Sequence, residues 1–254
     1  MRIVIKVGSA VLTENAKIAT QRLQALVDLI AELKKNHEVL LVSSGAVSAG
    51  YTQLKLDRSI LANKQALAAI GQPVLMDKYA KKFAKYEIIT SQVLVTAANL
   101  KKEDDICRIQ NTINTLLNNG VLPIINENDA TATDELEVGD NDQLSAYIAK
   151  HLDAQRLVIL SDIDAYYDFD PRANADAKVL KIVRTITQEE LSKDVTPNNL
   201  FATGGIVTKL KAAAYLLEND KETYLASGFD LSDCKSLLLE GLHKGGTLFT
   251  KAKQ

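Results

Sequence analysis

Short apolar runs alternate with longer amphipathic stretches along almost the whole chain. The run at 2–7 (RIVIKV) is rich in β-branched residues, and the runs at 38–45 (EVLLVSSG) and 156–162 (RLVILSD) are apolar until they end in small or polar residues. Runs of this kind predict buried strands. Similar patterns predict further strands at 87–96, 120–129, 177–183, 222–227 and 245–250.

The intervening stretches have the spacing of helices. In 21–36, five apolar residues fall on one helical face, at Leu23, Leu26, Val27, Ile30 and Leu33. Similar patterns predict helices at about 63–85, 105–118, 143–152 and 205–219, the first of them broken near Gly71–Pro73. Strands that alternate with helices predict an α/β fold, with a mostly parallel central sheet covered by helices on both faces as a three-layer sandwich. No linker or repeat interrupts the chain, so we expect a single domain, 1–254, with two lobes at about 1–155 and 156–254.

Composition narrows the class of protein without identifying it. The chain has 254 residues, 46% of them hydrophobic, and a formal net charge of -2. No overall basic charge therefore favours nucleic acid or an acidic membrane. The two cysteines form no CxxC or Cys/His pair, which argues against a zinc site and favours a reducing compartment. No stretch approaches the roughly 20 apolar residues of a membrane span, and the first residues lack the pattern of a signal peptide. We expect a cytoplasmic protein with no nucleic-acid or membrane partner.

The residues that follow the predicted strands are the candidates for chemistry, because ligands of open α/β sheets bind at the carboxyl ends of the strands. Lys6 and Gly8 come at the end of the first strand. A surface lysine is the simpler interpretation of Lys6 alone, but a lysine within a buried strand requires a charged partner. After the second strand, Ser44 and Gly45 form a small-residue turn into a helix. That turn is either an ordinary helix cap or an anion site.

The stretch NENDATATDELEVGDND (126–142) is dense in amides and carboxylates. A solvated hairpin explains its middle part. Four of its residues flank predicted buried elements: Asn126, Asp129, Asn141 and Asp142. Three interpretations compete for the group at 140–142, namely a helix cap, a metal site, or an anchor for a charged substrate. The spacing of an EF-hand loop is missing, which argues against a calcium site of that type.

Two further segments add to this pattern. Ser161 and Asp162 lie at the tip of the strand at 156–162. Near the C-terminus, Thr203, Gly204 and Gly205 precede a helix that carries Lys209. A glycine-rich turn, a helix N-terminus and a lysine at one end suit a phosphate. Each feature is weak alone, but together they are typical of phosphoryl transfer between two anions, where catalysis consists mainly of positioning and charge stabilisation.

Seven motifs occur in a fixed order along nearly the whole chain: KVGSAVL, VSSGAVSAG, KQALAAIGQP, PIINENDA, VGDNDQLSA, SDIDAYYDFDPR and TGGIVTKLKAA. Together they closely resemble the glutamate 5-kinases, enzymes of the amino acid kinase fold, and INEND with GDND separates them from acetylglutamate, uridylate and carbamate kinases. The resemblance implies ATP-dependent phosphorylation of the γ-carboxylate of L-glutamate to γ-glutamyl phosphate, the first step of proline biosynthesis. It also implies Mg²⁺ on the phosphates, with protein ligands that the sequence does not identify.

The resemblance assigns roles to individual residues. Lys6 matches the lysine that holds the transferring phosphoryl group, Lys209 lies in a matched ATP-binding segment, and Asp142 matches the aspartate that orients the two lysines. The expected glutamate site consists of Ser44, Asp129, Asn141, Asn126 and Asp140, of which Asp140 fits a helix cap equally well. The expected nucleotide site consists of Lys6, Gly8, Gly45, Ser161, Asp162, Thr203, Gly204, Gly205, Ile206, Val207, Thr208 and Lys209. Gly8 and Gly45 are expected to contribute backbone N–H donors.

The resemblance also suggests partners and leaves rivals. It implies a homo-oligomer, proline as a feedback inhibitor, and hand-over of the product to a glutamyl phosphate reductase. Many similar kinases continue into a C-terminal PUA domain, which we do not expect in this chain of 254 residues. A dehydrogenase is disfavoured because the GxGxxG motif is missing. A non-catalytic amino-acid sensor is disfavoured because Lys6 and Lys209 are both present, and a kinase of another small acid is the closest rival.

Overall fold

The fold is built on an eight-stranded sheet in the order β5-β6-β4-β1-β7-β9-β10-β8. The computed structural model describes residues 1–15, 17–131, 141–174, 176–192 and 205–252. Every neighbouring pair of strands in this sheet is parallel except β9 with β10. The mostly parallel central sheet predicted from the sequence is therefore confirmed.

The strands coincide with the apolar runs of the sequence. Their bounds are β1 Arg2–Val7, β4 Glu38–Ser43, β5 Thr90–Val95, β6 Leu122–Glu127, β7 Arg156–Ser161, β8 Ile182–Val183, β9 Glu222–Ser227 and β10 Thr247–Phe249. Most of the predicted strands are confirmed within a few residues. The one predicted at 177–183 is too long, because only its last two residues, in β8, pair with β10.

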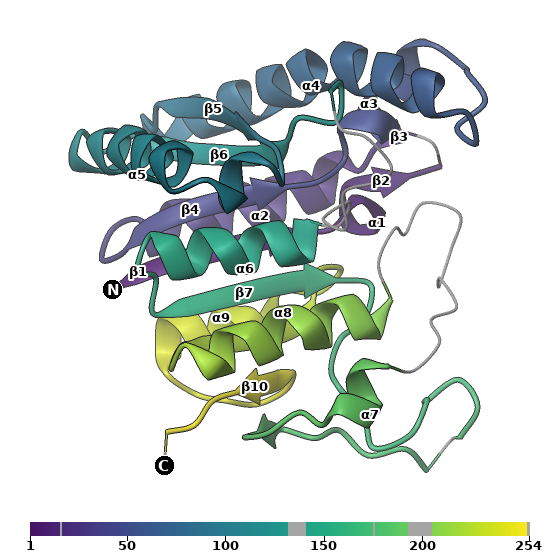
Figure 1. Ribbon diagram of the computed structural model, residues 1–254, viewed down its shortest axis with the longest axis vertical. Helices are drawn as coiled ribbons and strands as arrows, with labels where there is room; N and C mark the ends of the chain where they lie inside the picture. Colours follow the sequence, from purple (N-terminus) through teal and green to yellow (C-terminus); the bar gives the residue numbers. More distant parts are fainter. Residues whose placement is uncertain (16, 132–140, 175, 193–204, 253–254) are drawn as a thin grey trace.

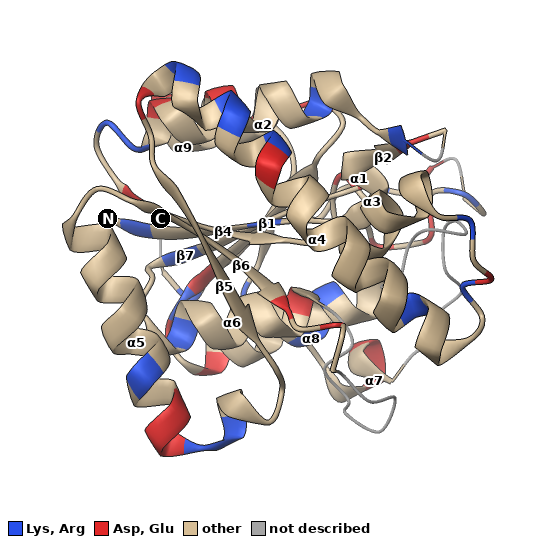
Figure 2. Cartoon of the chain, turned by 90° about the horizontal axis from the view of Figure 1, so that it is seen from above, with Lys and Arg blue, Asp and Glu red and all other residues tan. Residues whose placement is uncertain are grey.

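Helices cover both faces of the sheet, as Figures 1 and 2 show. The larger ones are α2 Thr20–Leu33, α3 Ala46–Gln53, α4 Leu61–Phe83, α5 Glu103–Asn118, α6 Asn141–His151, α8 Ile206–Glu218 and α9 Ser232–Glu240. Buried side chains of α2, α4 and α9 share one hydrophobic cluster with the sheet, and those of α5, α6 and α8 share another. The three-layer arrangement expected from the sequence is thus confirmed.

Alternation along β1 places its one lysine on the face covered by α6 and α8. Ile3, Ile5 and Val7 contribute to the core beneath α2, α4 and α9. Val4 contributes to the opposite core, beneath α5, α6 and α8. Since successive side chains of a strand point to opposite faces, Lys6 projects to the same side as Val4. A central strand thus delivers a cation to the N-terminal end of α6.

Helix α4 corrects one expectation. The sequence predicts a break near Gly71–Pro73, yet α4 runs without interruption from Leu61 to Phe83. Proline inside a helix costs about 3 kcal/mol through a lost hydrogen bond and a steric clash. Pro73 lies on the exposed side of α4, whereas Leu67, Leu75 and Tyr79 on its other side are buried. Packing on both sides of the proline therefore outweighs its local cost.

Several short elements are absent from the sequence-based prediction. A tight hairpin of β2 Thr13–Glu14 and β3 Lys17–Ile18 follows the short helix α1 Ser9–Leu12. Helix α7 Gln188–Leu191 and the 3-10 turns η1 Ala84–Tyr86 and η2 Asn99–Lys101 are equally short. Elements of two to four residues are too short to show a hydrophobic period. Helix α9 is longer but was also missed. Only three of its residues are buried, and the polar residues of its first half hide their helical spacing.

Helices α3 and α4 cross at two glycines that permit backbone contact. A Cβ atom on Gly71 would lie 1.8 Å from the carbonyl oxygen of Ala46 and 2.3 Å from the backbone nitrogen of Gly50. A Cβ atom on Gly50 would lie 1.9 Å from the carbonyl oxygen of Leu67. Only glycine fits at either position. The crossing holds α4 directly against the first turns of α3, which follows the carboxyl end of β4.

Gly71→Ala should therefore destabilise the protein, although alanine is normally the better helix residue. In an unconstrained helix, glycine to alanine gains about 1 kcal/mol. Here the added methyl group would push two backbones apart, and overpacking of this kind costs about 1–3 kcal/mol. Chemical denaturation should show a lower free energy of unfolding. Ala80→Gly, at an exposed position of the same helix, provides the reference for propensity alone. A Gly71→Ala variant more stable than the wild type would contradict the close crossing.

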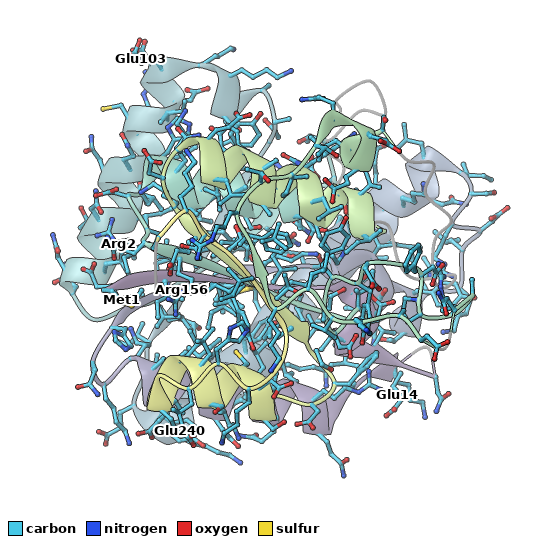
Figure 3. All side chains as sticks on the ribbon, turned by 90° about the horizontal axis from the view of Figure 1, so that it is seen from below. Met1, Arg2, Glu14, Glu103, Arg156 and Glu240 are labelled. Carbon is cyan, nitrogen blue, oxygen red and sulfur yellow. The ribbon has the colours of Figure 1, made fainter. Side chains whose placement is uncertain are left out.

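Charged residues at the amino ends of the strands are held in ion pairs. Figure 3 shows Arg2 and Arg156 near one another at one end of the molecule, away from Glu14. Arg2 contacts Glu38 at 3.0 Å, and Arg156 contacts Glu222 at 2.5 Å. Both arginines thus pair with carboxylates on neighbouring strands, far from the carboxyl ends where the candidate residues gather.

Within the part of the chain that the structure describes, no helix has both the length and the hydropathy needed to cross a membrane.

Candidate active site

Two lysines meet one aspartate at the carboxyl end of the central strands. The Nζ atom of Lys6, on β1, lies 2.5 Å from Oδ1 of Asp142. The Nζ atom of Lys209, on α8, lies 3.1 Å from Oδ2 of the same carboxylate. Lys6 is 4% exposed, Lys209 is 3% exposed and Asp142 is 0% exposed. The structure thus brings together the three residues that the sequence assigned to catalysis.

The ionised state of Asp142 depends on both lysines. Burial alone would raise the pKa of its carboxyl group, because the charged form loses its water. The nearby charges of Lys6 and Lys209 act in the opposite direction and hold this pKa well below its ordinary value. Asp142 also lies in the first turn of α6, where the helix dipole favours a negative charge. The result is a buried carboxylate with an ammonium group on each side.

The first turn of α8 is tied to the same carboxylate. The hydroxyl oxygen of Thr208 lies 2.9 Å from Oδ2 of Asp142 and 2.9 Å from the carbonyl oxygen of Gly205. Lys209 extends back toward that carbonyl as well, at 3.5 Å. Asp142 therefore fixes the start of α8, and not only the two lysine side chains. The sequence placed Thr208 with the nucleotide, whereas its hydroxyl group here contacts the residue that holds the lysines.

A chain of amides lies beside the lysine pair. Nδ2 of Asn141 donates to the hydroxyl oxygen of Ser44 at 2.8 Å and to Oδ1 of Asn126 at 3.2 Å. Asn126, the last but one residue of β6, donates to Gln72 of α4 at 3.0 Å. Residues from β6, α4 and α6 thus converge with Ser44, which follows β4. Three of the expected glutamate-site residues, Ser44, Asn126 and Asn141, lie in one network.

One oxygen of this network is left without a partner. Oδ1 of Asn141 is buried and accepts no hydrogen bond from the described residues. An unpaired buried acceptor costs about 1–3 kcal/mol, so native proteins rarely retain one without a role. The Ser44 oxygen accepts from Asn141, which leaves the hydroxyl hydrogen of Ser44 to be donated elsewhere. The network therefore presents one acceptor and one donor for a bound molecule.

Asp129 is a half-buried carboxyl group just beyond β6. Loss of water raises its pKa to about 6. No ion pair to Asp129 occurs among the residues that the structure describes. A carboxylate in this setting gains from a cation that arrives with a ligand.

The structure corrects the role expected of one glycine. The N–H group of Gly8 donates to the carbonyl oxygen of Leu160 at 3.1 Å, within the sheet. The donor expected from Gly8 is therefore already used, and what this glycine provides is space, since a Cβ atom there would lie 3.8 Å from Nζ of Lys6. Gly45 differs, because its φ of 106° lies in the left-handed region that favours glycine. It turns the chain from β4 into α3.

The remaining nucleotide candidates are only partly described. Ser161 and Asp162 lie at the end of β7, where the Ser161 hydroxyl donates to Asp162 at 2.9 Å. Ile206 and Val207 form the start of α8, after Gly205. Asp140, Thr203 and Gly204 lie outside the described residues. Within the described ranges, no group of three or more His, Cys, Asp or Glu could hold a metal ion.

Gln72 is a residue of the network that the sequence analysis missed. It is 7% exposed, and its amide contacts Asn126 on β6. A signal was present, because Gln72 falls on the apolar face of α4 in step with Ala68, Leu75 and Tyr79. A polar residue on a buried helical face needs a partner. The sequence could not show which partner that would be.

Comparison with known proteins identifies the family of this chain. Residues 1–227 match the amino acid kinase family. The chain is 52% identical to glutamate 5-kinase of Wolinella succinogenes over 98% of each chain, and 50% identical to glutamate 5-kinase of Leishmania donovani over 98% of this chain and 94% of that one. Carbamate kinase from Giardia lamblia, solved with AMP-PNP bound, has a similar fold, with a TM-score of 0.67 at 16% identity over 99% of this chain and 98% of that one. The chain belongs to the amino acid kinase family, in its glutamate 5-kinase branch.

Proposed function

We propose that this kinase transfers the γ-phosphoryl group of ATP to the γ-carboxylate of L-glutamate, forming γ-glutamyl phosphate and ADP. The observation that carries the proposal is the pair of buried ammonium groups on one carboxylate, Lys6 and Lys209 on Asp142. Such a pair suits the meeting of two anions, and the relatives are named for the glutamate reaction. The first lobe, about 1–155, would bind glutamate and the second, about 156–254, the nucleotide.

Charge compensation is the main task in this reaction. The attacking oxygen belongs to a carboxylate, which is already ionised, so no general base has to remove a proton. This oxygen forms the new bond to the γ-phosphorus while the bond to the bridging oxygen of ADP breaks. Lys6 and Lys209 would stabilise the negative charge that spreads over the transferring group. Asp142 would hold both ammonium groups in place before the substrates arrive.

Glutamate fits the donors and acceptors beside the lysines. The unpartnered Oδ1 of Asn141 and the carboxylate of Asp129 are both acceptors. We assign them to the α-ammonium group of glutamate, the only donor that this substrate carries at neutral pH. The hydroxyl group of Ser44 would donate to a substrate carboxylate. Both Asn141 and Asp129 would thus contact the ammonium end of glutamate.

The nucleotide would lie on the α8 side of the lysines. Gly205, Ile206 and Val207 start the helix whose dipole favours phosphate oxygens, and Ser161 with Asp162 line the neighbouring strand end. ATP would bring Mg²⁺, which would supply positive charge against the negative charge of the phosphates. Both oxygens of Asp142 already contact lysines.

Several wider expectations belong to the same proposal. They are a place at the start of proline biosynthesis, a cytoplasmic location, a homo-oligomer, proline as a feedback inhibitor and delivery of the acyl phosphate to a reductase. Their support is the similarity to glutamate 5-kinases. An acyl phosphate is a reactive mixed anhydride, which is the chemical reason to expect a consuming enzyme nearby.

Trapping of the product tests the proposed reaction. The purified chain, given ATP, Mg²⁺ and L-glutamate with hydroxylamine, should form γ-glutamyl hydroxamate and ADP in equal amounts. L-Aspartate, glutarate and other small acids, tested in parallel, should give much less. A folded preparation that binds nucleotide but forms no hydroxamate would overturn the proposal in favour of a sensor. Faster turnover of another acid would identify that acid as the substrate in place of glutamate.

The Asp129 carboxyl group should give the glutamate reaction an acid limb. Because its pKa is raised to about 6, the group becomes protonated, and loses its attraction for an ammonium group, as the pH falls below that value. With ATP saturating, kcat/KM for glutamate should fall about fivefold between pH 6 and pH 5, as expected for one ionisation of the unliganded enzyme. The γ-carboxyl group of glutamate titrates lower, near about 4.3.

Asp129→Asn supplies the control for this pH dependence. The variant should raise KM for glutamate at pH 7.5 and remove most of the acid limb, while KM for ATP stays near that of the wild type. Asn141→Ala should raise KM for glutamate but retain the limb. If the acid limb persists in Asp129→Asn, or if KM for ATP changes while KM for glutamate does not, Asp129 does not contact the amino acid.

A further inference from the structure

We propose that Gln72, on α4, is a positioning residue of the glutamate site, which together with the backbone N–H of Glu127 sets the polarity of the amide chain so that Oδ1 of Asn141 is presented to the substrate. The inference rests on the proposed function, because it assigns that oxygen to the ammonium group of glutamate. Gln72 itself would not touch the substrate. It acts through two intermediate residues, since it is hydrogen-bonded to Asn126 and Asn126 is hydrogen-bonded to Asn141.

The direction of the chain is fixed at one point by the backbone. The N–H group of Glu127 donates to Oδ1 of Asn126 at 2.9 Å. A backbone N–H can only donate, so this contact identifies the oxygen of the Asn126 amide. The nitrogen of Asn126 must then face Gln72, whose Oε1 accepts from it at 3.0 Å. Nε2 of Gln72 faces Oε1 of Gln92 on β5, at 3.3 Å.

The same direction propagates to the substrate side. Oδ1 of Asn126 is an acceptor, so Asn141 must present its nitrogen to it, at 3.2 Å. That nitrogen also donates to Ser44. The oxygen of Asn141 is consequently directed away from the network and remains unpartnered among the described residues. If Asn126 rotated its amide by 180°, Asn141 would have to turn as well, and the site would offer a donor where an ammonium group needs an acceptor.

Gln72 opposes such a rotation together with the N–H group of Glu127. In the rotated state, the Asn126 nitrogen would face the Glu127 N–H and the Asn141 nitrogen, donor against donor. Gln72 adds an acceptor that only the observed orientation can use, in a setting where an unmade hydrogen bond costs about 1–3 kcal/mol. With an apolar residue at position 72, the nitrogen of Asn126 would be buried without a partner in the observed orientation.

The position of Gln72 is itself tightly defined. It follows Gly71, whose contact with Ala46 and Gly50 holds α4 on α3. Two turns further along the same face, the hydroxyl of Tyr79 lies 2.9 Å from Oγ of Ser43, next to Ser44. Tyr79 is fully buried. Helix α4 therefore supports the carboxyl ends of β4 and β6 at the same time, which allows one amide on it to set the geometry of the site.

The test compares Gln72→Leu with Gln92→Ala and uses two ligands. Gln72→Leu keeps the approximate volume and removes the acceptor, whereas Gln92→Ala removes only the exposed outer end of the chain. Initial rates in the hydroxamate assay would give kcat and KM for glutamate and for ATP. The inhibition constant of glutarate against glutamate would report binding of a ligand that lacks the ammonium group. Thermal unfolding of each variant would report stability.

We expect Gln72→Leu to raise KM for glutamate about tenfold or more, and to change the inhibition constant of glutarate and KM for ATP by less than about threefold. Gln92→Ala should behave like the wild type. An unchanged KM for glutamate in Gln72→Leu would overturn the inference, as would an equal loss for glutamate and glutarate, or a lower melting temperature alone. Wild-type hydroxamate formation separates these outcomes from failure of the proposed function, which would appear as no hydroxamate from any of the proteins.

Discussion

Replacing Lys6 or Lys209 with methionine should lower kcat by about 100-fold or more, the scale expected when a preorganised charge at the transition state is lost. Methionine retains most of the buried stem and removes the ammonium group. Each lysine would stabilise charge that develops during transfer, so KM for glutamate and ATP should change much less than kcat. Steady-state rates measured as hydroxamate formation provide the comparison.

Lys211→Met is the matched control for this result. Lys211 lies on the same helix as Lys209 but on its exposed side, so its kcat should equal that of the wild type. Melting temperatures of all three variants would show whether the active-site substitutions leave the protein folded. A folded Lys6→Met or Lys209→Met protein with near-normal kcat would remove that lysine from the mechanism.

Asp142→Asn should have a comparably large effect for a different reason. The substitution is nearly isosteric but removes the negative charge between two ammonium groups that contact opposite oxygens of the same side chain. Without it, the lysines repel one another and lose their fixed positions. Breaking a buried ion pair from one side costs about 3–5 kcal/mol. We expect both a fall in kcat of about 100-fold or more and a clearly lower unfolding free energy.

The pH dependence separates Asp142 from Asp129. The folded-state pKa of Asp142 is lowered, so its ion pairs stabilise the fold above the ordinary Asp value of about 4 and are lost only as the pH falls below it. Asp142→Asn should therefore remove stability throughout pH 5–8 without altering the acid limb near pH 6. Asp153→Asn, which breaks an exposed contact with Lys221, should change neither kcat nor this profile. Wild-type stability in Asp142→Asn would contradict the buried bridge.

The sequence predicted those features that depend on the hydrophobic pattern of one segment or on the chemistry of one residue. The run at 2–7 predicted β1, and the cost of burying an unpaired charge predicted a partner for Lys6, which the structure identifies as Asp142. Likewise, the polar residues after successive parallel strands had to meet at one end of the sheet. Ser44, Asn126 and Asn141 do meet there. These predictions depend on topology, which the alternation of elements largely determines.

Other features depend on pairs of distant residues, and a single sequence cannot reveal them. Pro73 suggested a broken helix, but the continuity of α4 results from packing on both sides of it. The expected donor of Gly8 is occupied by Leu160, a neighbour only after β1 and β7 have paired. Gln72 finds Asn126 because α4 lies where the glycine crossing puts it. In each case, the deciding contact is tertiary.

The central place of β1 has a consequence for how the chain folds. This strand is made before both of its partners, and it pairs with β4 on one side and with β7, about 150 residues later, on the other. At ribosomal rates of about 5–20 residues per second, its second partner appears roughly 8–30 s after it. During that interval RIVIKV is an apolar segment with an unsatisfied edge, of the kind that aggregates. We expect Lys6 to act there as a gatekeeper, because a charge within such a segment opposes self-association, and the same lysine enters the active site only when β7, α6 and α8 close around it.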